Sequence, residues 1–151
     1  MVIASSTFIS DIVLFIRNTL RSQLTDPLGR NADNSHFVFT SFPKDNTTYP
    51  LVTVKATNFN TKKLGMTTEV SWVDCNIEVR VWARNAKEVD NLTQSVIDKM
   101  RTAQYGTGGT SAEEIFGFTL SSCVPIVEDL GDQNLIHSKV STFKFSCILG
   151  N

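Results

Sequence analysis

The sequence has little excess charge of either sign and few cysteines, and each shortage argues against a class of protein. Lys and Arg total 14 against 15 Asp and Glu, which gives a formal net charge of −1. DNA-binding and membrane-surface proteins usually carry a marked basic excess, so the bulk charge predicts no polyanion partner. The cysteines form no C-x-x-C, so the sequence suggests neither a zinc knuckle nor a disulfide framework. We expect Cys75, Cys123 and Cys147 to be buried free thiols.

Long apolar runs are also missing. No apolar stretch approaches the ~20 residues that a membrane-spanning helix needs. Residues 1–17 could be mistaken for a signal peptide, but they lack a basic start and a clear cleavage site, and Asp11 interrupts the apolar run. We therefore expect a protein that is made and used in a cytoplasm, without a membrane partner.

Two segments have the apolar spacing of amphipathic helices. At 151 residues the chain is long enough for one domain, residues 1–151, with a sizeable core. The first helix is predicted over 7–24, where Leu14 and Phe15 fall off the main stripe and indicate a second covered face. The second helix starts at Asn85, which can act as an N-cap, and stops before Gly106.

Strands are predicted over 37–42, 51–59, 70–84, 114–124 and 137–149, and 125–136 is interpreted as a connection or a short strand with a turn at Gly131. In VSWVDCNIEVRVWAR (70–84) the odd positions are apolar and the even ones are polar, apart from two Trp. That alternation is typical of a half-buried antiparallel strand and not of a parallel one. The sequence thus predicts an α+β fold: an antiparallel sheet of four to five strands with both helices packed on one face.

The strand over 70–84 would span about 50 Å if straight, whereas a globule of this size is roughly 38 Å across. Either the strand bends at a bulge and packs within the domain, or it belongs to a long projecting β-hairpin with its tip at 61–66. Trp, Met and Arg are enriched in interfaces. The candidate contacts with another subunit or protein are Lys62, Lys63, Leu64, Met66, Trp72, Arg80, Trp82 and Arg84.

No motif in the sequence carries catalytic chemistry. The glycine-rich YGTGGTS (105–111) follows a helix and precedes a strand, the reverse of a phosphate-binding loop. His36 and His137 lie at strand ends, and the acidic pairs 113–114 and 128–129 point to opposite faces if extended, so we interpret them as solubilising loop residues. We predict no catalytic, cofactor-binding or metal-binding residue, and no enzyme activity.

The order of elements resembles one family, the tail terminator (tail-completion, head–tail joining) proteins of long-tailed phages and related viruses. The similarity covers an N-terminal helix, the strand YPLVTV (49–54), the strand-into-helix CNIEVRVWARNAKEVDNLTQSVIDKM (75–100) and the closing VPIVEDLGDQNLIHSKVSTFKFSC (124–147). The resemblance implies a structural virion protein of the tail–neck junction, assembled in the host cytoplasm. It implies a homo-oligomeric ring, commonly a hexamer, that caps the tail tube and ends its growth.

The same resemblance implies three partners besides other copies of the chain: the tail tube protein, the head-closure or connector protein, and genomic DNA passing through the lumen without specific binding. Two other interpretations stay open at this point. The chain could be another neck component, such as a head-closure or adaptor protein, or a small α+β ligand-binding module.

Overall fold

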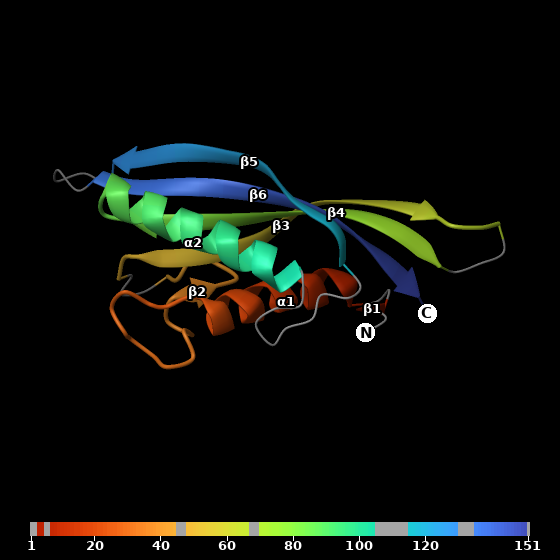
Figure 1. Ribbon diagram of the computed structural model, residues 1–151, viewed down its shortest axis with the longest axis horizontal. Helices are drawn as coiled ribbons and strands as arrows, with labels where there is room; N and C mark the ends of the chain where they lie inside the picture. The colour runs from red at the N-terminus through yellow and green to blue at the C-terminus, as the bar shows by residue number, and fades with distance from the viewer. Residues whose placement is uncertain are drawn as a thin grey trace.

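A computed structural model describes residues 3–4, 7–44, 48–66, 70–104, 115–129 and 135–150. It is an α+β structure in which two helices accompany a mixed β-sheet (Figure 1).

Helix α1 (Phe8–Gln23) forms where the sequence predicts it, within one residue at each end. Ile12, Ile16 and Leu20 make a buried stripe along it. Beyond its last turn, the side-chain amide of Asn34 donates hydrogen bonds to the carbonyl oxygens of Arg21 (2.7 Å) and Leu24 (2.6 Å). These bonds satisfy carbonyl groups that have no partner within a helix, so Asn34 acts as a cap supplied by the following loop.

Helix α2 (Ala86–Gln104) also follows the prediction. The side-chain oxygen of Asn85 accepts a hydrogen bond from the backbone N–H of Glu88 at 2.8 Å, which confirms the N-cap. Val89, Val96 and Met100 are buried on its inner side.

The sheet is mixed, so the prediction of an antiparallel sheet is only partly right. Its strands are β1 (Ile3–Ala4), β2 (Val38–Phe39), β3 (Leu51–Lys63), β4 (Ser71–Ala83), β5 (Ile115–Asp129) and β6 (Leu135–Gly150). The order is β1-β6-β4-β3-β2, with β5 also paired to β6. β3, β4, β6 and β5 are antiparallel neighbours, whereas β1–β6 and β2–β3 are parallel pairs. Leu149 pairs with both β4 and β1, so β1 continues the edge of β6 that β5 occupies.

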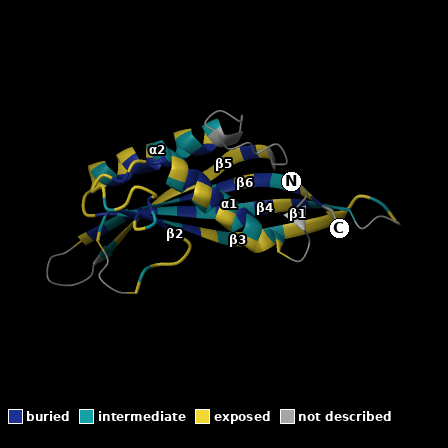
Figure 2. Cartoon of the chain, turned by 90° about the horizontal axis from the view of Figure 1, so that it is seen from below, coloured by how far each residue is buried: buried dark blue, intermediate teal, exposed yellow. Residues whose placement is uncertain are grey.

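The core lies between the helices and one face of the sheet. The predicted apolar positions of β4, from Val73 to Ala83, are all buried. They form one cluster with α1, α2 and the inner residues of β6, so both helices pack on this face as predicted. Figure 2 shows that burial is greatest under the helices and falls off toward the far ends of β3 and β4.

Several strands and one thiol differ from the sequence-based expectation. β2 is only two residues long, β1 was not expected, and β3 extends to Lys63. β5 runs without a break through Pro125 to Asp129, where a connection or a separate short strand was expected, because a proline fits in an edge strand. Cys123 on this strand is exposed, contrary to prediction, whereas Cys75 and Cys147 are buried. The glycine-rich segment 105–111 and the turn at Gly131 lie outside the described residues.

A bulge in the strand over 70–84 was one of the two possibilities left open, and the structure has a bulge on the neighbouring strand β3 instead. The register between β3 and β4 shifts between Ala56 and Asn58, so Thr57 is an extra residue on β3. Its hydroxyl donates to the carbonyl oxygen of Asn76 on β4 at 3.0 Å. β4 itself pairs continuously with β6 from Ser71 to Ala83.

Candidate interaction surfaces

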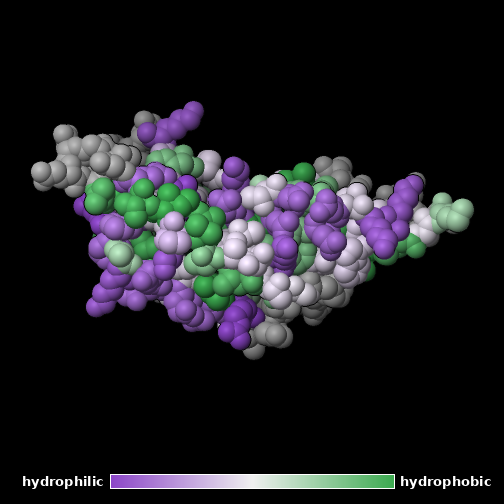
Figure 3. All heavy atoms as spheres, turned by 90° about the horizontal axis from the view of Figure 1, so that it is seen from above, coloured by the Kyte–Doolittle hydropathy of each residue, from purple (hydrophilic) through white to green (hydrophobic). Residues whose placement is uncertain are grey.

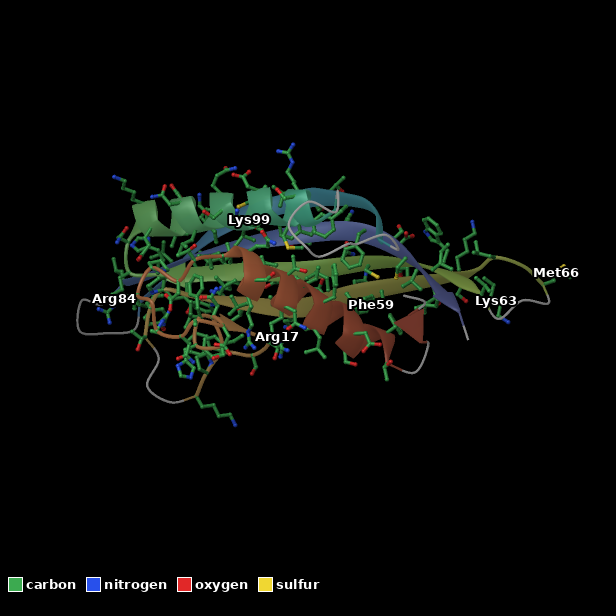
Figure 4. The ribbon with its side chains drawn as sticks, turned by 60° about the horizontal axis from the view of Figure 1, so that its bottom comes forward. Arg17, Phe59, Lys63, Met66, Arg84 and Lys99 are labelled. Carbon is green, nitrogen blue, oxygen red and sulfur yellow. The ribbon has the colours of Figure 1, made fainter. Side chains whose placement is uncertain are left out.

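The predicted contact residues fall into separate groups in the structure. Lys62 and Lys63 lie at the exposed end of β3, and Leu64 and Met66 follow in the connection to β4. The exposed fractions are 54% for Leu64 and 101% for Met66, so Met66 is fully exposed and Leu64 about half-exposed. Figure 4 places Lys63 and Met66 at one end of the molecule and Arg84 at the other.

Arg80 and Trp82 form an internal cluster on the face of β4 opposite the helices. The Arg80 guanidinium lies 3.7 Å from the centre of the Trp82 ring. It also donates to the Ser138 hydroxyl on β6 and pairs with the Glu128 carboxylate on β5. Phe42 packs edge-on against Trp82, with ring centres 5.0 Å apart. The cluster ties four segments of the chain together.

This cluster changes the interpretation of two residues. Glu128 was expected to be a solubilising loop residue, but it lies on β5. It binds Arg80 because β4 and β5 both pair with β6 and their side chains reach each other across it. Arg80 is left with only 20% of its side chain exposed. Much of its interaction capacity is therefore used within the chain.

Trp72 belongs to a second polar group on the same face. Its indole N–H donates to the Asp74 carboxylate at 2.9 Å, and the Ser146 hydroxyl donates to the same carboxylate at 2.6 Å. These two hydrogen bonds, that of Ser146 first, lower the pKa of Asp74 and keep it charged. The Trp72 ring is half-buried beside this charge.

A further exposed surface, which the sequence analysis missed, lies along β5. Apolar side chains gather there when the molecule is viewed from the β5 side (Figure 3). We call this the β5 edge surface, and its exposed apolar members are Leu120, Val124, Ile126, Val127 and the neighbouring Leu135. Its signal in the sequence was the apolar run VPIV (124–127), which is too short to distinguish a strand from a connection.

A shallow depression among the described residues is wide enough for a small ligand to enter. It has a volume of about 460 Å³ and lies beside the end of α1, with Asn18, Arg21 and Asn34 in its wall. The Arg21 guanidinium already donates to the carbonyl oxygen of Val38, and the Asn34 amide caps α1. Its main polar groups are therefore used in holding α1 to the loop and β2.

The structure describes both histidines, for which the sequence analysis predicted no catalytic role. His36 is exposed in the loop before β2, and His137 is half-buried on β6. Within the described part of the chain no three His, Cys, Asp or Glu side chains lie close enough together to hold a metal ion. Glu113 and Glu114 lie outside the described residues.

Comparison with models of known protein families finds no match, and no curated protein matches the sequence. Neither described helix is long and apolar enough to cross a membrane.

Proposed function

We propose that this chain is a structural virion protein of the tail–neck region. In this proposal several copies form a ring that caps the tail tube, ends its polymerisation and joins the tail to the head. The function rests on surface complementarity and requires no covalent chemistry. The observation that carries it is the pair of exposed apolar side chains, Leu64 and Met66, beside Lys62 and Lys63 at one end of the molecule.

The far end of β3 and β4 supports the proposal through its burial pattern. The last residues of β3, Asn60 to Lys63, are all exposed, although they are paired to β4 as far as Ser71. In Figure 1 this part of the two strands lies beyond the ends of both helices. We propose that it is the stem of a projecting hairpin whose tip contacts the tail tube or a neighbouring subunit. Exposed apolar residues at such a tip are explained by a partner that covers them.

Exposed apolar residues on helix α1 are consistent with the proposed ring. Leu14 was predicted to lie on a second apolar face, and 38% of this residue is exposed. Ile9 on the same helix is 49% exposed. Phe15 instead packs against the core. A cyclic ring needs two different patches on each subunit, one for each neighbour. Helix α1, which carries Ile9 and Leu14, and β5 lie on opposite sides of the molecule (Figure 1), so these two sides can hold the patches.

The near-neutral net charge suits a pore through which DNA passes without being gripped. The partners that follow from the proposal are other copies of the chain, the tail tube protein, the head-closure or connector protein, and genomic DNA in the lumen.

Gold-labelled antibody imaged on purified particles tests the location. We expect label only at the junction of head and tail. Label along the whole tail or on the capsid, or absence of the protein from particles, contradicts the proposal.

Removal of the gene separates the two neck functions. Loss of a terminator leaves tails that are overlong and unattached. Loss of a head-closure or adaptor protein leaves tails of normal length beside heads that cannot bind them. Tails of normal length would therefore favour the second neck function over the one proposed.

A further inference from the structure

The sheet has two open edges on opposite sides. β2 pairs only with Val52 and Thr53, so residues 54–63 of β3 have no strand on their outer side among the described residues. β5 pairs with β6 on one side and with no described strand on the other. An open edge exposes a row of backbone N–H and C=O groups that can pair with another strand.

We propose that the open edge of β5 in one copy pairs antiparallel with residues 54–63 of β3 in a neighbouring copy. This inference deepens the proposed ring, on which it rests, by assigning the two surfaces that join its subunits.

Strand direction supports this pairing. β3, β4, β6 and β5 alternate in direction, so β5 is antiparallel to β3 within one copy. A second copy moved sideways without being turned over therefore presents its β3 antiparallel to β5 of the first. All copies then face the same way. A ring with one face for the tail tube and the other for the connector requires that arrangement.

Charge supports the same pair of edges. Residues 54–63 contain Lys55, Lys62 and Lys63 and no acidic residue. Residues 115–129 contain no Lys or Arg, so β5 brings no like charge to these lysines. Like charges that face each other on paired strands destabilise the pair. Pairing of two β3 edges would bring lysines together, which disfavours a two-fold dimer through β3.

The local structure of β5 also disfavours the two-fold alternative through β5 itself. Pro125 has no backbone N–H, and a proline on an edge strand leaves one donor missing from the open side. The register between β5 and β6 also shifts twice, between Phe116 and Thr119 and between Leu120 and Ser122. Two β5 edges paired together would combine these interruptions, whereas residues 54–63 of β3 contribute a single bulge, at Thr57.

The apolar residues of the β5 edge surface gain from this contact. Val124 and Val127 are 51% and 57% exposed. A neighbouring sheet closing beside β5 removes their side chains from water, and apolar burial is the main favourable term in association. The second copy is therefore the occupant that fits the edge in direction, charge and hydrophobicity.

The native Cys123 makes the test direct, because it is the one exposed thiol among the three and lies on β5. The strand registers place Cys123 level with Val54, so a second thiol is introduced close to that position on β3, as Lys55→Cys or Thr57→Cys, both at exposed positions. The concentrated protein is treated with a short bis-maleimide, and its mass is measured before and after. Asn91→Cys on the exposed side of α2 is the matched control.

We expect the β3 variants to give a ladder of covalent oligomers that extends beyond the dimer, since each copy offers one β5 thiol and one β3 thiol. The ladder should be lost completely when Cys123→Ser is added, and Asn91→Cys should not give it.

Three results overturn the inference, and they separate it from the proposed function. A wild-type dimer linked through Cys123 alone, with no larger species, would mean that β5 pairs with β5. A ring detected by mass measurement without any covalent ladder would agree with the proposed ring but contradict the assignment of its interface to β5 and β3. A monomer that gives no ladder at any concentration would reject both the edges and the ring in solution.

Discussion

The carboxylate of Asp26 and the guanidinium of Arg30 form a two-point ion pair, with N–O distances of 2.9 and 3.0 Å. Only 2% of the Asp26 side chain and 17% of the Arg30 side chain are exposed. Arg30 also donates to the backbone carbonyl oxygens of Thr48 and Pro50. The pair therefore fastens the loop after α1 to the chain that enters β3.

Asp26→Ala should destabilise the fold by about 3 kcal/mol, because it leaves a mostly buried guanidinium without its partner. Urea unfolding at neutral pH measures the change. Asp98→Asn on the exposed side of α2 is the control, and its midpoint should stay close to that of the wild type. An equal loss in both variants would mean that the ion pair has no special role.

The same pair predicts a pH dependence. Burial works to raise the pKa of Asp26, but the hydrogen bonds from Arg30 and from the backbone N–H groups of Leu28 and Arg30 outweigh it, and the pKa falls below 3.8. A carboxyl group with a depressed pKa in the folded state stabilises the fold above its ordinary pKa. That stabilisation is lost as the pH falls below 3.8 and through the folded-state value. Asp26→Asn should remove this part of the acid sensitivity in an unfolding series from pH 5 to 2. An unchanged acid profile in the variant would contradict the assignment.

Arg80→Lys should weaken the cluster around Trp82 by about 1 kcal/mol. Lysine keeps the charge but loses the planar stacking on the indole ring and the fork that reaches Ser138 and Glu128. Thermal unfolding measures the stability, and the emission maximum of the tryptophans reports on the ring environment. Arg84→Lys, on an exposed neighbour, should change neither. If Arg80→Lys changes neither as well, Arg80 is free for an intermolecular contact.

Replacing Leu64 and Met66 together by Ser should leave the stability within about 0.5 kcal/mol of the wild type, because Met66 is fully exposed and Leu64 about half-exposed in the free molecule. Assembly should fail, since buried interface anchors are each worth about 2 kcal/mol or more. Particle yield and tail length measure it. Leu28→Ser, also at a half-exposed position, is the control and should give normal particles. Normal tails in the double variant would show that this end makes no essential contact.

Of the three cysteine thiols, only that of Cys123 should react quickly with a maleimide or disulfide reagent in the native protein. Cys123 is exposed, whereas Cys75 and Cys147 are buried with their sulfur atoms 3.9 Å apart. The hydrogen bond with Cys147, followed by burial, raises the pKa of Cys75 and keeps it a thiol. All three should react once the protein is unfolded. Two or more fast thiols in the native state would mean that the sheet opens near Cys75.

The parts of the fold that could be predicted are those in which one segment determines its own structure. The stripe of Ile12, Ile16 and Leu20, the Asn85 cap and the alternation along β4 each specify an element without knowledge of its neighbours. The short strands β1 and β2 could not be predicted, because two residues carry no periodicity. Their parallel direction depends on how the chain returns to the sheet.

Side-chain contacts between strands could not be predicted from the sequence for a related reason. Arg80, Trp82 and Glu128 come together only through the register of β4 with β6 and of β6 with β5. The exposed apolar character of β5 likewise depends on its position at an edge. The same residues on a central strand would have been covered on both sides.

β6 follows every other element in the chain, yet it lies between β4 and β5. As the polypeptide is synthesised, β4 and β5 therefore emerge before the strand that separates them. Until β6 pairs, the apolar inner residues of β4 lack part of their cover, and β5 has no neighbour on the side it later shares with β6. A nascent chain in this interval offers unpaired strands to any similar chain nearby. Slow or interrupted translation of residues 135–150 should then increase aggregation on the ribosome, without any change in the stability of the finished protein.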